Sequence, residues 1–240
     1  MALLVSACGF TEPRKFIVIN EAHDIESSFL ISALIGQRLR LQNSGLVLIC
    51  CHQSFKYYDA CGKKLGYNLS MSVSKKCLRV VEPLKDMINL KEDELIKHLM
   101  DEINNNLKLL EDDNKKNITI IIDDLSFFMS LGCSEKSLIK LGLKLHELSQ
   151  KKDSLSFVLK VGLSDFHSYL SNNLEDLADV LLSVERLKSG KFWDVDGRIT
   201  IKKMNMQSSI PLVESERSLL YFIGDHNVKL SAPGEFGLKV

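Results

Sequence analysis

Five short apolar runs recur along the first two thirds of the chain, and polar residues bound each of them. They cover residues 16–20, 46–51, 78–81, 118–122 and 157–161. Runs of this length that are apolar at nearly every position are typical of strands buried on both faces, as in a parallel sheet. We therefore predict five core strands, and residues 177–184 are a candidate for a sixth.

Apolar residues at helical spacing fill the intervals between these runs. We predict helices over residues 27–40, 54–65 and 91–110, the last with leucine or isoleucine at positions 95, 99, 103, 107 and 110. Leucines at positions 138, 141, 145 and 148 predict a further helix, with Ser134 as its N-cap. Strands that alternate with helices in this way indicate an α/β domain with a mainly parallel sheet.

The pattern changes after residue 165. Asp196-Gly197 is a two-residue hairpin signal between residues 192–195 and 198–201, and a second hairpin is expected around residues 224–227. We therefore expect a single domain over residues 1–240, with a parallel core over about 14–184 and antiparallel strands over about 185–236.

Residues 219–223, in the second predicted hairpin, are apolar at every position. Neighbouring residues of a strand point to opposite faces, so one apolar face can pack on the core while the other needs a different cover. Exposed apolar patches favour association. We expect either a partner protein or a helix of the same chain to cover the second face.

The charge of the chain is balanced, because 31 Lys and Arg residues oppose 31 Asp and Glu residues. A protein that binds nucleic acid by itself usually has a basic excess. Any RNA binding is therefore expected to be local, weak or shared with partners. Residues 55–58, Phe-Lys-Tyr-Tyr, are a candidate base-stacking surface, but their spacing on a helix favours a place in the core or an interface. Lys-Lys pairs begin at positions 63, 75, 115, 151 and 202 and are more typical of solvated surface.

Six cysteines are present, and none forms a C-x-x-C pair, so neither a zinc ribbon nor a redox motif is indicated. Several lie inside apolar runs, which favours buried, reduced thiols in a reducing compartment. Residues 2–10 are apolar but lack the basic leader of a signal peptide. No apolar run approaches the roughly 18 residues of a membrane span. We expect an intracellular protein with no membrane partner.

Residues 21–28 follow the first predicted strand, where a P-loop protein has the motif G-x-x-x-x-G-K-[ST]. In that motif, backbone N–H groups wrap the phosphates and the lysine neutralises their charge. Here only the final serine matches, and carboxylates stand where a triphosphate would sit, so the loop is expected to repel ATP. No cofactor is predicted. The residues of this degenerate phosphate loop are Glu21, Asp24, Glu26, Ser27 and Ser28.

The strand at residues 118–122 ends at Asp123-Asp124 and resembles a Walker B strand, whose terminal carboxylate meets magnesium. Because the phosphate loop is degenerate, we favour the alternative that Asp123 and Asp124 only cap the turn at Leu125. The histidines are dispersed without an i, i+4 pair, and no G-x-S-x-G elbow is present. We therefore predict no catalytic residue and no metal ligand.

The order and spacing of several short segments resemble the Elongator complex protein 6 family. The matching segments are His52-Gln53-Ser54-Phe55 with Tyr58, Gly62-Lys63-Lys64-Leu65-Gly66 with Leu69, Ile122-Asp123-Asp124-Leu125-Ser126 with Leu131-Gly132, and the tail from Asp196-Gly197-Arg198 through Tyr221-Phe222-Ile223 and Val228 to Gly234. The resemblance covers residues 16–82, 117–132 and 194–236, whereas residues 83–116 and 135–190 match only in general layout.

The resemblance implies a RecA-like fold without ATPase motifs, with antiparallel hairpins at the C-terminus. It also implies a heterohexameric ring with two copies each of Elongator subunits four, five and six. That ring joins the catalytic Elongator subcomplex, which modifies wobble uridines in tRNA, and it is thought to bind tRNA and to use ATP in releasing it. The modification chemistry belongs to a different subunit. A cytoplasmic location is implied, with a nuclear one also open.

The leading prediction is therefore a non-catalytic assembly subunit rather than an enzyme. Two alternatives stay open: an inactive RecA-like scaffold in another complex, such as one in recombination or signalling, and an ATPase with an atypical phosphate loop. The identity of co-purifying proteins separates the first alternative from the leading prediction. Nucleotide binding separates the second.

Overall fold

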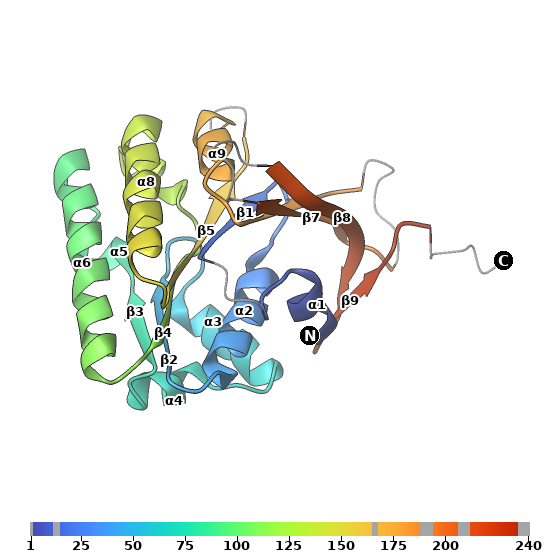
Figure 1. Ribbon diagram of the computed structural model, residues 1–240, viewed down its shortest axis with the longest axis horizontal. Coiled ribbons are helices and arrows are strands. Elements are labelled where there is room, and N and C mark those ends of the chain that lie inside the picture. Colours follow the sequence, from blue (N-terminus) through green and yellow to red (C-terminus); the bar gives the residue numbers. More distant parts are fainter. Residues whose placement is uncertain (1, 12–14, 165–167, 188–193, 206–211, 235–240) are drawn as a thin grey trace.

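The computed structural model describes residues 2–11, 15–164, 168–187, 194–205 and 212–234 (Figure 1). Within these ranges, nine strands form one sheet in the order β3-β2-β4-β5-β1-β6-β7-β8-β9. The first six strands pair in parallel, and β7, β8 and β9 are antiparallel. The strands are β1 (Phe16–Glu21), β2 (Ser44–Ile49), β3 (Leu78–Val81), β4 (Asn117–Ile122), β5 (Leu155–Gly162), β6 (Val180–Glu185), β7 (Gly197–Asn205), β8 (Leu212–Ile223) and β9 (Val228–Ser231). The predicted parallel core followed by antiparallel strands is confirmed.

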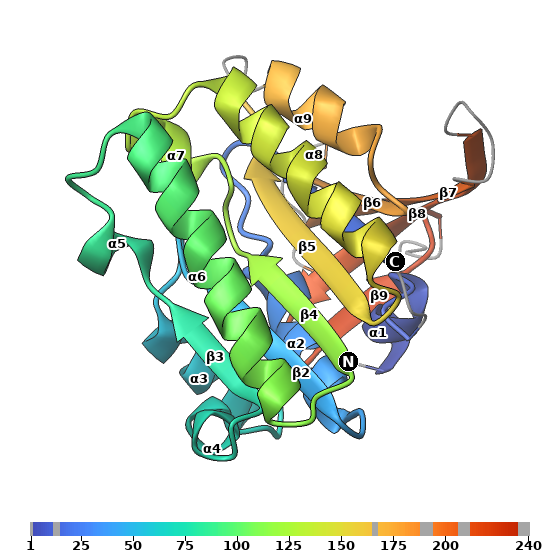
Figure 2. The same cartoon turned by 60° about the vertical axis from the view of Figure 1, so that its left-hand side comes forward.

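The continuous apolar runs became strands because both faces of the sheet are covered. In Figure 2, α6, α8 and α9 lie in front of the sheet, and α2 and α3 lie behind it. The helices described are α1 (Ala2–Ala7), α2 (Ser28–Arg40), α3 (Phe55–Lys64), α4 (Leu69–Ser74), α5 (Pro83–Asp86), α6 (Glu92–Asp112), α7 (Phe127–Ser130), α8 (Glu135–Lys151) and α9 (Ser168–Glu175). None of these helices is long and apolar enough to cross a membrane.

Each face of the sheet has its own hydrophobic core. The apolar stripe of α6, with Leu95, Leu99 and Ile103, is fully buried in the first core. The second core lies under α1, α2 and α3 and includes Leu30 and Tyr58. A fully buried leucine or isoleucine side chain contributes about 1.5–3 kcal/mol, so these stripes hold the helices on the sheet.

The boundary of β2 differs from the predicted one by two residues at each end. Its apolar run continues through Cys50 and Cys51, which are buried but lie in the loop beyond the strand. Cys50 still donates its backbone N–H to the carbonyl of Val81 at 2.8 Å, whereas the Cys51 N–H donates to the carboxylate of Asp123 at 2.6 Å. The apolar pattern therefore reports burial here, and the strand ends where the backbone leaves its strand partner.

The hairpin predicted at Asp196-Gly197 is wrong in its pairing. Of its first arm, residues 192 and 193 lie outside the described ranges, and Val195 forms only a single bridge. Gly197 instead begins β7, which pairs with β6 on one side and with β8 on the other. The backbone N–H of Asp196 donates to the carbonyl of Tyr221 at 2.8 Å, so this segment is tied to β8. The predicted second turn is confirmed by a 2.8 Å hydrogen bond from Gly224 N to Asn227 O.

The apolar run at residues 219–223 divides between the two faces of β8. Leu219 and Tyr221 are buried, and the Tyr221 ring lies 4.9 Å from that of Phe29 on α2. A helix of the same chain therefore covers this face. Leu220 and Phe222 point to the other face and are half-buried. Only the first of the two faces is fully packed within the described residues.

Candidate functional site

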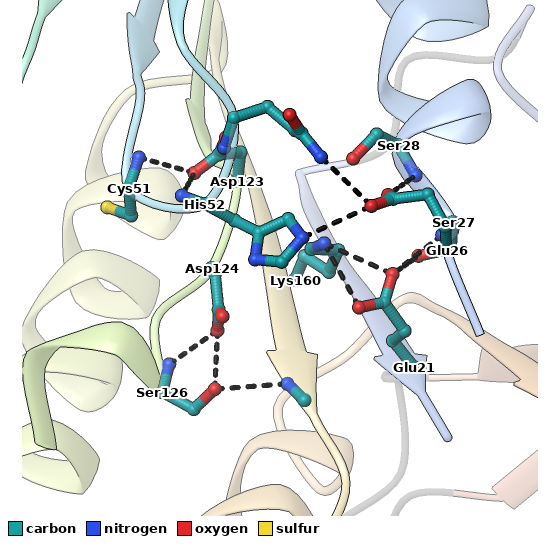
Figure 3. A network of polar contacts seen from close by, with 12 residues as sticks. Glu21, Glu26, Ser27, Ser28, Cys51, His52, Asp123, Asp124, Ser126 and Lys160 are labelled. Carbon is teal, nitrogen blue, oxygen red and sulfur yellow. Dashed lines mark hydrogen bonds and ion pairs between the residues drawn. The ribbon is translucent and has the colours of Figure 1, made fainter. Parts of the chain in front are cut away.

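The loops that follow β1, β2 and β4 meet at one edge of the sheet (Figure 3). They meet because β4 lies beside β2, and only β5 separates β4 from β1. In open parallel sheets, ligands bind in crevices outside the carboxyl ends of the strands. The segments that meet are residues 21–28, 50–54 and 123–126, so the sheet brings the degenerate phosphate loop and Asp123-Asp124 close together.

Glu21 is the last residue of β1, and its carboxylate is bonded inside the protein. It accepts hydrogen bonds from the backbone N–H of Ser27 at 2.6 Å and from its hydroxyl at 2.5 Å. The ammonium of Lys160 on β5 lies 3.2 and 3.1 Å from its two oxygens. Lys160 is completely buried, so this ion pair is formed away from water. The carboxylate thus holds the start of α2 against the middle of the sheet.

Glu26 links the loop after β1 to the loop after β2. Its carboxylate accepts the backbone N–H of Ser28 at 2.8 Å and the side-chain amide of Gln53 at 3.0 Å, and it lies 3.1 Å from Nε2 of His52. Burial by itself would raise the pKa of Glu26, but hydrogen bonding by Ser28, the charge of Lys160 and the amide of Gln53 lower it to about 2. Glu26 is therefore ionised and already satisfied by neighbouring donors.

Asp24 does not join the other two acids. Its backbone has a φ of 62°, and its side chain turns towards His23, with 3.3 Å between Oδ1 and Nε2. The side chain is 59% exposed. The guanidinium of Arg186 donates two hydrogen bonds to the Asp24 carbonyl, at 3.1 and 2.7 Å. The predicted cluster of three acids is therefore a pair, Glu21 and Glu26, with Asp24 facing outward.

Asp123 does not cap the following turn, so that part of the favoured interpretation is wrong. It accepts three backbone N–H groups of the loop after β2, from Cys51 at 2.6 Å and from His52 and Gln53 at 2.9 Å. The hydroxyl of Tyr58 donates to it at 3.1 Å. Burial raises the pKa of Asp123, while the three backbone hydrogen bonds act in the opposite direction. The side chain reaches across to β2 because the N–H groups there have no strand partner.

Asp124 does cap the turn that leads into α7, as predicted. Its carboxylate accepts the backbone N–H of Ser126 at 2.9 Å and also the Ser126 hydroxyl. That hydroxyl in turn accepts the N–H of Gly162 at 3.2 Å. The two acids therefore have separate structural partners, and Figure 3 shows their side chains pointing to different loops.

The predicted aromatic surface at residues 55–58 belongs to the same support. Tyr58 is fully buried beneath the loop after β2, and the ring of Tyr57 packs edge-to-face on it with 5.4 Å between centroids. Tyr58 is therefore a core residue that supports the loop, as the spacing favoured.

Sequence reasoning missed Lys160 and the partners His52 and Gln53. Lys160 lies within the apolar fifth strand, 139 positions from Glu21, and only an isolated lysine in a strand with two buried faces signals it. Such a charge requires a buried counter-charge. Among the described residues, no group of three or more His, Cys, Asp and Glu side chains is placed to hold a metal ion.

A model of the family described as Elongation complex protein 6 matches residues 2–225. The chain belongs to this family. It is 32% identical to Elongator complex protein 6 of Drosophila melanogaster over 98% of the chain and 97% of that protein. It is also similar to the proteins of the same name from Danio rerio, at 26% identity over 83% of the chain and 84% of that protein, and from Rattus norvegicus, at 25% over 93% and 92%.

A solved structure outside the family identifies the fold. The chain is similar to a KaiC-like protein from the hyperthermophilic archaeon Pyrococcus horikoshii, with a TM-score of 0.62 and 11% identity over 90% of this chain and 89% of the other. At this identity the likeness concerns the fold alone. The fold of this Elongation complex protein 6 family member is RecA-like, as predicted.

Proposed function

We propose that this chain is a non-catalytic subunit of the Elongator complex, and that it assembles with Elongator subunits four and five into a heterohexameric ring. The ring binds tRNA and supports the modification of wobble uridines, whose chemistry belongs to the catalytic Elongator subcomplex. The family match supports membership of the complex. The RecA-like fold supports assembly into a ring.

One observation carries the non-catalytic part of the proposal. The buried cation at the end of the sheet, Lys160, is already paired with Glu21 at 3.1 Å, and no second lysine or arginine occurs in residues 21–28. A triphosphate would have to break this pair and approach Glu26 and Asp123 as well. Breaking a buried ion pair costs about 3–5 kcal/mol, and repulsion between the charges adds to that.

Location and domain organisation belong to the same proposal. The chain is placed in the cytoplasm and also in the nucleus, with no membrane partner. All six cysteines are unpaired, which supports a reducing compartment. The nine described strands share one sheet, which supports a single domain over residues 1–240.

Affinity purification of the chain from its native cells, followed by mass spectrometry, tests membership of the complex. Elongator subunits four and five are expected among the most abundant partners. A reproducible set of other partners without these subunits would instead support the alternative of an unrelated RecA-like scaffold.

Calorimetry with Mg-ATP tests the non-catalytic assignment against the alternative of an atypical ATPase. The isolated chain is expected to give no binding heat, while the assembled ring serves as the positive control because its other subunits supply nucleotide sites. A dissociation constant in the low micromolar range for the isolated chain, about −8 kcal/mol, would overturn the assignment.

A further inference from the structure

The balanced net charge of the chain hides two faces of opposite sign. Residues 36–77, from the end of α2 through α4, include a single acidic residue, Asp59. Their basic residues are Arg38, Arg40, Lys56, Lys63, Lys64, Lys75 and Lys76. On the other side of the sheet, α6 has seven acidic residues and two lysines, Lys97 and Lys108. Figure 2 shows α6 in front of the sheet and α2, α3 and α4 on the opposite side or lower edge.

The basic face contains a groove of about 540 Å³ between α2, α3 and α4. We call it the basic groove and define it by Arg40, Lys63, Tyr67, Ser72 and Lys75, which line it. Each of its three cations lies near the C-terminal end of a helix, where a positive charge also stabilises the helix dipole. That role does not require the three helices to end around one groove, so the convergence needs a separate explanation.

Two of the three cations have no internal counter-charge. Lys63 pairs with Asp59 at 2.7 Å. Arg40 and Lys75 are exposed, and neither forms an ion pair with another residue in the described ranges. Arg38, in the same last turn of α2, is buried, and burial lowers its pKa. The groove therefore presents unneutralised positive charge to solvent.

The floor of the groove is fixed in place. The ring of Tyr67 packs against Gly36 of α2 and Gly62 of α3, where an added Cβ would come within 2.7 and 2.5 Å of ring carbons. Its hydroxyl donates to the carbonyl of Ser32 at 2.7 Å. The two glycines thus let an aromatic side chain fill the space between the helices, so the basic groove is formed before any ligand binds.

We propose that the basic groove binds phosphate groups of an RNA backbone, which in the assembled ring is that of tRNA. The identity of the RNA rests on the proposed function, whereas the site rests on the charge and shape of this face. Lysine is depleted at protein–protein interfaces, but Lys63 and Lys75 both line this groove beside the hydroxyl of Ser72. Cations, hydroxyls and amides of this kind are the usual contacts of nucleic-acid phosphates.

The test uses the ring co-expressed with Elongator subunits four and five, and a labelled tRNA transcript followed by fluorescence anisotropy between 50 and 200 mM salt. Arg40→Glu with Lys75→Glu is expected to weaken binding about tenfold or more, because each lost phosphate contact lowers the slope of log K against log salt by about 1. The neutral pair Arg40→Gln with Lys75→Gln is expected to lower the slope similarly with a smaller loss of affinity. Lys63 is left unchanged because its partner Asp59 also accepts the N–H groups of Leu69 and Ser70 at 3.1 Å.

The matched control is Lys97→Glu with Lys108→Glu on α6, which changes the net charge by the same amount. This control is expected to alter affinity less than twofold. Equal losses in both double variants would show a general charge effect and overturn the groove. Loss of ring assembly in the groove variants alone would identify an acidic protein partner instead of RNA. If the unaltered ring binds no tRNA, the tRNA part of the proposed function fails together with the groove. If it binds and the groove variants match it, only the groove fails.

Discussion

Lys160 has the strongest single influence on what the edge of the sheet can bind. It lies on the central strand β5 with no exposed surface, and its charge is balanced by Glu21. Sequence reasoning identified Glu21 and Glu26 as carboxylates that exclude a nucleotide, but it treated them as bare charges. The structure gives each of them donors within the protein, because the sheet brings together residues that lie far apart along the chain.

Replacement of Lys160 by Met is expected to destabilise the chain by about 3–5 kcal/mol, because it leaves the Glu21 carboxylate buried without a counter-charge. The double variant Lys160→Met with Glu21→Gln is expected to recover a large part of this loss. Urea unfolding followed by circular dichroism measures both. Lys144→Met, at an exposed position of α8, serves as the control and is expected to stay within about 0.5 kcal/mol of the unaltered chain. Equal stability of the single and double variants would contradict the ion pair.

Replacement of Asp123 by Asn is expected to cost about 1–3 kcal/mol, because the amide turns a donor towards N–H or O–H groups that are themselves donors. The same substitution is expected to leave the ATPase activity of the assembled ring nearly unchanged, since the role of Asp123 is to hold the loop after β2. Asp112→Asn on exposed α6 is the control for stability. A tenfold fall in ATP turnover with intact assembly would show that Asp123 contributes to a composite site.

At the scale of elements, the sequence predicts what continuous apolar runs and heptad-like leucines encode. The strand at residues 78–81 and the N-cap of α8 at Ser134 match the structure, where the Ser134 side chain accepts the N–H of Ser137. The short α4, Leu-Ser-Met-Ser-Val-Ser, was not predicted, because its apolar pattern is weak. Its first N–H groups are instead held by Asp59 of α3. Contacts of this kind cannot be read from local spacing.

Gly62→Ala tests the packing between α2 and α3. Alanine favours helices over glycine by about 1 kcal/mol, but here its Cβ would lie 2.5 Å from a Tyr67 ring carbon. The substitution is therefore expected to destabilise the chain by about 1–3 kcal/mol. In a Tyr67→Ala background the same change is expected to be neutral or stabilising, and thermal unfolding of the four chains compares them. Destabilisation of the same size in both backgrounds would exclude the clash as its cause.

At the scale of the whole molecule, the RecA-like sheet and membership of the Elongation complex protein 6 family were both predicted from the order of short segments. The uneven distribution of charge was not, because lysines that are scattered along the sequence gather on one face only after α2, α3 and α4 pack together. The half-buried Leu220 and Phe222 on the outer face of β8 remain a surface where a ring neighbour can bind. These features all lead to a chain whose role depends on partners.

Native mass spectrometry of the chain co-expressed with Elongator subunits four and five tests the central claim most directly. The account predicts one dominant assembly with two copies of each of the three subunits, and the chain expressed alone is expected to associate or to be poorly soluble because an apolar face stays uncovered. A stable, monodisperse monomer that does not bind either subunit when co-expressed with them would contradict the account.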